Sequence, residues 1–159
     1  RFCGAFFDCT ALKEIALPEG LTTIGSYAFY NCTSLTDIVI PASVTTIGTG
    51  IFNYCENLES VKFAEGSKLE SIEAITFNNC KKLSDITIPA SVKSIGKNAF
   101  TNCKNLKSMR LSRTITIMTA PSFTFSSLTA VNTPSAFMPA SISILLISCS
   151  SCVKGPRTV

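Results

Sequence analysis

Cysteine is the residue with the most obvious chemistry in this chain, and five of its eight cysteines recur at a regular interval. Cys9, Cys32, Cys55, Cys80 and Cys103 are separated by steps of 23, 23, 25 and 23 residues. A metal site needs ligands within a few residues of each other, and these spacings offer none. Free cysteine often packs as a small apolar residue, so we predict that the five thiols fill space in a core and bind no metal or cofactor.

Other uses of the cysteines have weaker support. A disulfide between neighbouring members of the series is sterically conceivable, but parallel Cβ vectors and an odd count argue against it. Cys149 and Cys152 form a C-x-x-C pattern that suits a redox pair or half a metal site. The chain has no second such pair and no histidine, which disfavours both roles. Cys3 is expected to be exposed.

Catalytic chemistry has little to build on. Without histidine the chain lacks the usual general base and the usual Ser-His and Cys-His nucleophile pairs. The acidic pairs Glu56/Glu59 and Glu70/Glu73 are best interpreted as solvated surface charges. Asn31-Cys32-Thr33 fits the glycosylation sequon, but Asn31 occupies a recurrent turn position, so a structural role is favoured. We predict that the chain is not an enzyme.

The cysteine spacing belongs to a longer repeat. The segment Ala28 to Leu35 recurs at 51–58, 76–83 and 99–106, with an N-terminal copy at 5–12. The aromatic position keeps the same step, at Phe6, Phe29, Phe52, Phe77 and Phe100. A period in the low twenties is typical of leucine-rich repeats. The sequence therefore predicts a β-rich solenoid of about five coils of 23 residues with short parallel strands.

One copy shows how a coil is expected to form. From Leu35 to Pro41, β-branched residues dominate and Ile38 and Ile40 alternate with Val39, which predicts a short strand with one buried face, closed by the proline. A second extended piece follows from Val44 to Ile47. Gly48 then ends it, where we expect a residue free to take a positive φ. The segment from Ser26 to Cys32 is expected to be a turn that packs Ala28 and Phe29 inward.

Stacked coils place like residues beside one another at about 4.8 Å. The core should therefore consist of ladders running along the array, because no coil can bury its apolar face alone. The third copy departs from the pattern at 61–66 and is two residues longer. We expect a longer loop there and no break in the solenoid. The ladders are those of the phenylalanines above, of Leu12, Leu35, Leu58, Leu83 and Leu106, and of Ile24, Ile47, Ile72 and Ile95.

Composition and charge fit a packed protein. Of the 159 residues, 46% are hydrophobic and 15% are charged, which is ample for a core. Up to Leu111 the chain holds 11 Lys or Arg against 10 Asp or Glu, and this near balance favours no nucleic-acid partner. The chain begins at Arg1 without the strand that should precede the first copy, so we expect it to be a piece of a longer protein.

The composition changes at Ser112. The tail 112–159 contains 17 Ser or Thr in 48 residues, four of the seven prolines and no acid. It could be a cap on the last coil, a Ser/Thr-rich disordered stalk, or the product of a shifted reading frame. Its most apolar stretch, Ile142 to Ile147, is too short to span a bilayer. We divide the chain into a solenoid at 1–111 and this tail at 112–159.

The repeat pattern resembles a known family. The motif LxxIxIPxSVxxIGxxAFxxCxx, read at 35–55 and 83–103, resembles the BspA-like leucine-rich repeats, also called the Treponema pallidum type. The resemblance extends from Phe2 to about Leu111. It implies a cell-surface or secreted protein that adheres to host or cell-surface proteins, and it carries over no catalytic residues. The alternative is an intracellular scaffold or a structural spacer without an adhesion role.

The predicted solenoid also indicates where a partner would bind. The outward positions of the long strands should line one face and vary from coil to coil while the core stays constant. This is expected when a fixed scaffold presents a tunable surface to another protein. The candidate binding residues are Glu14, Ala16, Asp37, Val39, Ser60, Lys62, Asp85, Thr87, Ser108 and Arg110.

Overall fold

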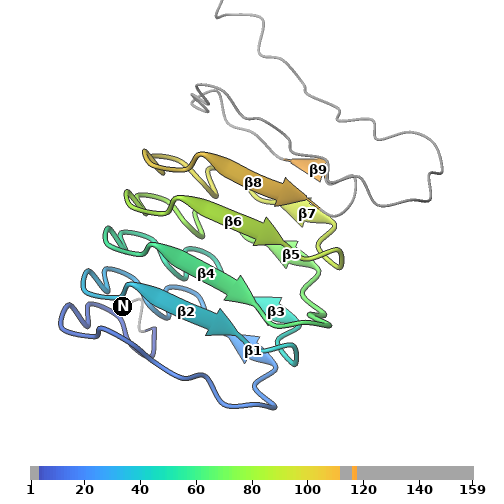
Figure 1. The fold of residues 1–159 in the computed structure, drawn as a ribbon. Coiled ribbons are helices and arrows are strands. Elements are labelled where there is room, and N and C mark those ends of the chain that lie inside the picture. The colour runs from blue at the N-terminus through green and yellow to red at the C-terminus, as the bar shows by residue number, and fades with distance from the viewer. Residues whose placement is uncertain (1–3, 112–115, 118–159) are drawn as a thin grey trace, which may run out of the picture.

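The computed structural model describes residues 4–111 and 116–117, which form a β-solenoid of about four turns (Figure 1). Each turn carries one longer and one shorter strand, and all pairing is parallel. No helix occurs within the described residues. The longer strands are β2 (Asp37–Ile40), β4 (Ser60–Phe63), β6 (Asp85–Ile88) and β8 (Ser108–Leu111). The shorter ones are β1 (Thr23–Ile24), β3 (Thr46–Ile47), β5 (Ser71–Ile72), β7 (Ser94–Ile95) and β9 (Thr116–Ile117).

The alternation predicted for the long strands is confirmed. In β2, Ile38 and Ile40 are buried while Asp37 and Val39 are exposed. Successive side chains of a strand point to opposite faces, so a strand with one buried face buries every second residue. β2 ends immediately before Pro41, which cannot donate to a ladder. The long strands therefore form one outer face, and their inward side chains enter the core.

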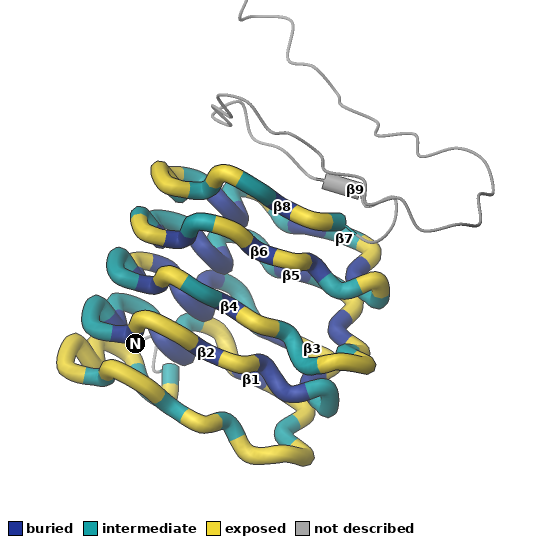
Figure 2. The backbone as a smooth tube through the Cα atoms, in the orientation of Figure 1, coloured by how far each residue is buried: buried dark blue, intermediate teal, exposed yellow. Residues whose placement is uncertain are grey.

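The core consists of the predicted ladders. Neighbouring rings of the phenylalanine series are stacked, with centroids 5.0 to 5.6 Å apart. Leu35, Leu58 and Leu83 are completely buried, and the four isoleucines of the short strands are at most 4% exposed. In Figure 2 the buried stretches of backbone recur from turn to turn along the array. Phe6 and Leu12 belong to the first coil and are only half-buried. Within the described residues this coil packs against a neighbouring coil on one side only.

The first predicted coil is the least regular. Residues 12–18 form no strand, so Glu14 and Ala16 are exposed but lie outside the sheet. Ile15 and Leu17 in this segment are only half-buried against the core. Since a terminal coil packs on one neighbour, it buries less surface and gains less from ladder pairing. Long strands consequently form in four of the five predicted coils.

The reason predicted for Gly48 is wrong. Its φ is not positive; positive φ occurs at Gly20, Gly50 and Gly66 instead. A Cβ built on Gly48 would lie 2.3 Å from the backbone nitrogen of Ser26 in the preceding turn. Glycine is required here because two backbones approach closely, a constraint that exists only between coils.

The longer third copy interrupts the sheet. β2 pairs with β4 and β6 pairs with β8, but no ladder joins β4 to β6. On the short-strand side the break falls between β3 and β5. Both breaks separate strands that precede the loop 64–70, which holds the extra residues, from strands that follow it. The strands before this loop, β1 to β4, pair only among themselves, and so do the strands after it, β5 to β9.

The opposite side of the solenoid continues across this break. The amides of Gly50, Phe52 and Tyr54 donate hydrogen bonds of 2.9 to 3.0 Å to the carbonyls of the next turn. The rings of Phe52 and Phe77 also stack across it, 5.6 Å apart. The prediction of an unbroken solenoid thus holds for the core and the phenylalanine turns, whereas the hydrogen-bonded sheet is split.

Several predictions fall outside the described residues. They concern Cys3, Cys149, Cys152 and the three alternatives for the tail. β9 lies beyond the predicted boundary at 111 and pairs with β7, which extends the short-strand ladder to Ile117. Within the described part of the chain, no helix is long and apolar enough to cross a membrane.

Candidate protein-binding face

The long strands bring together eight of the ten candidate residues. Their parallel register aligns the outward positions of successive turns into two columns on one face. Six of these side chains are exposed, and Ser60 and Ser108 are half-buried. Glu14 and Ala16 do not join the columns, since their segment forms no strand. The columns are Asp37, Ser60, Asp85 and Ser108, and beside them Val39, Lys62, Thr87 and Arg110.

The two columns differ in chemistry. The first alternates aspartate with serine, so its charge is negative. The second begins with an apolar residue, Val39, which is 53% exposed, and continues with Lys62 and Arg110 on either side of Thr87. A large apolar side chain held on an exposed sheet beside charges of both signs can contact a protein surface through burial and through ion pairs.

Charge is not evenly mixed along the array, contrary to what the overall balance suggested. Residues 4–79 contain three lysines against nine acids, a net charge of −6, and residues 80–111 contain seven basic residues against one acid, a net charge of +6. Because successive turns stack in order, sequence position becomes position along the solenoid (Figure 1). The part of the array formed by residues 4–79 is therefore acidic, and the part formed by residues 80–111 is basic. Counting charges repeat by repeat in the sequence would have predicted this polarity.

Three ion pairs join the acidic part to the basic part. Lys81 lies 2.7 Å from Glu56, Lys82 lies 3.6 Å from Glu59, and Lys93 lies 2.8 Å from Glu70. These acids were predicted to be solvated surface charges, and they are exposed, but each also has a lysine partner in the next turn. The pairs at Glu56 and Glu59 lie across the split in the sheet, whereas the pair at Glu70 lies beside the β5–β7 ladder. All six side chains are at least 39% exposed, so each pair contributes little to stability.

The cysteine ladder lies in the core, away from the face. Cys32, Cys55 and Cys80 are fully buried, as predicted, whereas Cys103 is half-buried and Cys9 is exposed. All five are free thiols, and the described residues contain no cluster of side chains suited to a metal. Sequence reasoning missed one role. Each thiol from Cys32 onward donates to the carbonyl of the phenylalanine in the preceding turn, at 3.0 to 3.2 Å.

Burial suppresses the reactivity of these thiols. It raises the pKa of Cys32 to about 11 and that of Cys55 to about 12, from 9.0, and raises the pKa of Cys80 well above 9.0. A raised pKa disfavours the thiolate, which is the reacting form. At pH 8 a thiol with a pKa near 11 is ionised in about one molecule in a thousand.

Alkylation should therefore separate the cysteines. With iodoacetamide at pH 8, we expect the folded protein to be modified at Cys9 and to remain unmodified at Cys32, Cys55 and Cys80. Peptide mapping by mass spectrometry measures this, and the same reaction in urea provides the control, since all of these thiols should then react. Rapid modification of Cys55 in the folded protein would contradict its burial.

The asparagine turn has the predicted structural role. Asn31 adopts a φ of 56°, and residues at the same position in the other coils are also in the left-handed region. Its side-chain amide donates to the carboxylate of Asp8 in the preceding turn at 2.5 Å, and Asn102 donates to Asn79 at 2.9 Å. Asparagine and aspartate tolerate this conformation better than most residues.

Comparison with known proteins identifies the family. The model of the BspA type leucine rich repeat region matches residues 3–68 and 34–143, so the chain belongs to this family of leucine-rich repeat proteins. No curated protein sequence gives a significant match.

Solved structures agree with this assignment. A leucine-rich repeat protein of T. pallidum is 29% identical, with a TM-score of 0.59 over 65% of this chain and 47% of that one. A leucine rich cell surface protein of Faecalibacterium prausnitzii is 26% identical, with a TM-score of 0.57 over 67% and 32%. A leucine-rich repeat protein of Bacteroides ovatus is 32% identical, with a TM-score of 0.58 over 65% and 26%. The chain spans less than half the length of each.

Proposed function

We propose that this chain is a protein-binding module of a secreted or cell-surface adhesion protein, and that its partner contacts the outward face of β2, β4, β6 and β8. The observation that carries the proposal is the contrast between the two sides of these strands. Inward positions are occupied by Ile, Val, Met and other apolar residues, while outward positions change from Asp and Val to Lys, Thr and Arg. The scaffold is thus constant where it packs and varied where it is exposed.

The surroundings of the face support the same proposal. Leucine-rich repeats form extended sheets whose curvature and repetition suit binding to other proteins. Within the described residues no acidic or cysteine cluster offers a metal centre, and the phenylalanine turns use their amides to join neighbouring coils. The cell-surface location is suggested by the family resemblance and by the cell surface protein of F. prausnitzii.

A charge exchange tests the face. The double variant Asp37→Lys, Lys62→Glu preserves net charge and changes only exposed side chains, and we expect it to weaken partner binding at least about tenfold by opposing the partner's charges. The partner should first be sought by capture on the full chain from extracellular-matrix proteins and a cytosolic lysate in parallel. The dissociation constant of both forms is then measured by surface plasmon resonance.

A second exchange provides the control. The variant Glu70→Lys, Lys93→Glu also preserves net charge, and it reverses an ion pair on the short-strand side, away from the face. It should bind like the unmodified chain. Equal binding by all three forms would contradict a role for the face, and a specific partner found only in the cytosolic lysate would favour the scaffold alternative.

A further inference from the structure

A cluster of aromatic side chains lies on the phenylalanine turns of the first three coils. Phe7 stacks on Tyr30 with ring centroids 4.6 Å apart, and Tyr27 and Tyr54 meet Tyr30 at steep angles, at 6.0 and 5.7 Å. The cluster contains all three tyrosines of the chain. Phe7 is 39% exposed and Tyr54 is 41% exposed, so the cluster reaches the surface. This aromatic cluster shares no residue with the proposed binding face.

Tyr54 has a backbone conformation that suits other residues better. Its φ is 65°, and the other four coils have aspartate or asparagine at this repeat position, with φ between 56° and 62°. The left-handed region is costly for a bulky residue, whereas asparagine and aspartate tolerate it. These residues also join turns, as when the amide of Asn31 donates to Asp8. A tyrosine held in this conformation indicates a role for its exposed ring.

The clustering is local and is not a property of the repeat. Phe7 and Tyr30 occupy a repeat position that is asparagine or threonine in the three later coils. The ring of Tyr27 lies over Gly50, where an added Cβ would be 2.7 Å from the Cε1 atom of the ring. The first three coils therefore carry an aromatic surface, and the chain leaves space for it.

The surroundings of the aromatic cluster are negatively charged. Its three turn segments contain two acids, Asp8 and Glu56, and no lysine or arginine. Glu56 is paired with Lys81 at 2.7 Å, whereas Asp8 is exposed and has no ion pair within the described residues. Residues 4–79 as a whole carry a net charge of −6. A positively charged partner is therefore favoured here. The three segments are 4–12, 26–35 and 49–58.

An aromatic surface beside a carboxylate suits guanidinium groups. The planar cation of arginine stacks on the face of a tyrosine ring, and its N–H groups donate to carboxylate oxygens. Tyr30 covers at most one face of the Tyr54 ring, since the two rings meet at 62°. Tyrosine and arginine are also among the residues that contribute most to binding between proteins.

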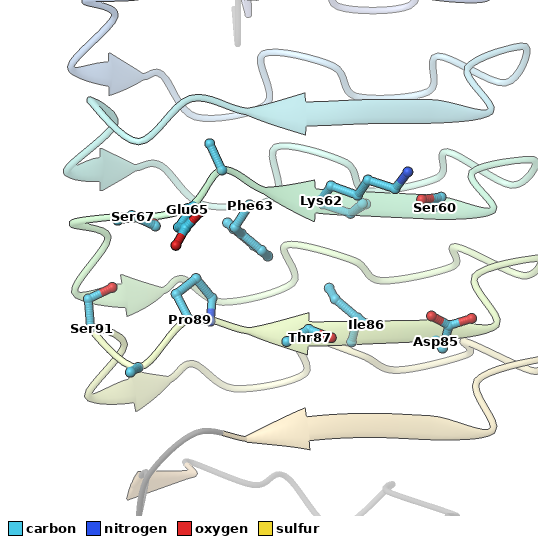
Figure 3. A pocket seen from close by; sticks show the side chains of 14 residues that line it. Ser60, Lys62, Phe63, Glu65, Ser67, Asp85, Ile86, Thr87, Pro89 and Ser91 are labelled. Atoms are coloured by element: carbon cyan, nitrogen blue, oxygen red, sulfur yellow. The ribbon is translucent and has the colours of Figure 1, made fainter. Parts of the chain in front are cut away.

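The hollow between β4 and β6 is less selective. It has a volume of about 690 Å³, and its lining side chains come from the two strands and the loops that follow them (Figure 3). Its charged residues are Lys62, Glu65 and Asp85, so charges of both signs are mixed. β4 and β6 are also neighbours in the stack, which leaves no room for a strand between them. The aromatic cluster, in contrast, combines one type of side chain with one sign of charge.

We propose that the aromatic cluster binds an arginine-bearing segment of a partner protein. One guanidinium group stacks on the ring of Tyr54, and a second pairs with the carboxylate of Asp8. These two residues occupy the same repeat position two turns apart, a separation of roughly 10 Å. In an extended segment this matches arginines at positions i and i+3, because each residue spans about 3.3 Å. The proposal concerns a second surface and does not depend on the proposed function.

Intrinsic fluorescence tests the proposal. The chain has no tryptophan and its three tyrosines all belong to the aromatic cluster, so tyrosine emission reports on this surface. On titrating the full chain with the peptide Gly-Arg-Gly-Gly-Arg-Gly, we expect a saturable change in emission. The same peptide with citrulline for arginine lacks the charge and should bind at least about tenfold more weakly. Absence of a response, equal binding of the citrulline peptide, or a response to cellohexaose alone would overturn the proposal.

A substitution at Tyr54 separates binding from stability. Tyr54→Asn places the residue of three other coils at this position, and it should weaken binding of the arginine peptide at least about tenfold. It should not lower the midpoint of thermal unfolding, because relief of the left-handed conformation offsets the lost contact with Tyr30. Unchanged affinity, or a fall of the midpoint by more than about 4 °C, would overturn the assignment of Tyr54 to binding.

Two further variants test the charge and the location. Asp8→Asn keeps a residue suited to this turn and should lower affinity about threefold. It should matter less for Gly-Gly-Arg-Arg-Gly-Gly, whose adjacent arginines cannot reach both Asp8 and Tyr54. Val39→Thr removes an exposed apolar residue from the proposed binding face and should leave the affinity for both peptides unchanged. An affinity that is insensitive to Asp8→Asn, or as sensitive to Val39→Thr as to Tyr54→Asn, would overturn the proposal.

Discussion

Replacing Phe52 with alanine is expected to lower the free energy of unfolding by about 3–5 kcal/mol, the usual cost of truncating a buried aromatic residue. Phe52 is 0% exposed, and its ring is stacked between Phe29 at 5.5 Å and Phe77 at 5.6 Å. It also lies where the sheet is split, so the core contributes more of the contact between the two parts there than elsewhere. The resulting cavity cannot be filled by one neighbour without disturbing the next turn.

Urea unfolding followed by circular dichroism measures this loss. Phe7→Ala is the matched control, because Phe7 is 39% exposed and stacks on the surface with Tyr30, 4.6 Å away. We expect a cost of about 0.5–1.5 kcal/mol for that pair. Stability in a repeat array is shared between neighbours, so the Phe52→Ala protein should also unfold less cooperatively across the split in the sheet. Equal costs at Phe52 and Phe7 would contradict the stacked core.

Replacing Gly48 with alanine is expected to destabilise the array by about 3 kcal/mol, at the upper end of the usual cost of overpacking. The added Cβ would lie 2.3 Å from the nitrogen and 2.6 Å from the Cα of Ser26. Both atoms belong to the backbone of the preceding turn, so no side chain can rotate away. The turns would have to separate locally, at the expense of the β1–β3 pairing beside them.

Two further variants check this explanation. Gly96→Ala should behave like Gly48→Ala, because its Cβ would lie 2.5 Å from the backbone nitrogen of Ala74. Thr49→Ala changes the next residue without adding atoms and should alter stability by less than about 0.5 kcal/mol, as surface substitutions usually do. Thermal unfolding of the three variants compares them directly. A Gly48→Ala protein as stable as the unmodified chain would show that the close approach is not a constraint.

The sequence by itself determined the repeat, the strands and the core. A period of 23 residues aligns equivalent positions of successive coils, so the identity of the residue at each position predicts its neighbours as well as its own burial. This is why the stacked phenylalanines, the buried leucines and the alternation in β2 could all be predicted. The same logic identified Asn31 as a turn residue and the central cysteines as core residues.

Only the tertiary structure decided how the coils meet. The close approach at Gly48, the thiol hydrogen bonds to preceding carbonyls and the ion pairs at Glu56 and Glu59 are contacts between turns. Whether such contacts form depends on differences of a few tenths of an ångström in the spacing of the turns, and a residue pattern does not contain that information. The two extra residues of the third copy showed where the chain is irregular. Whether they would form a simple loop or split the sheet depended on how far the loop displaced the following strands. That displacement is set by the packing of the whole turn.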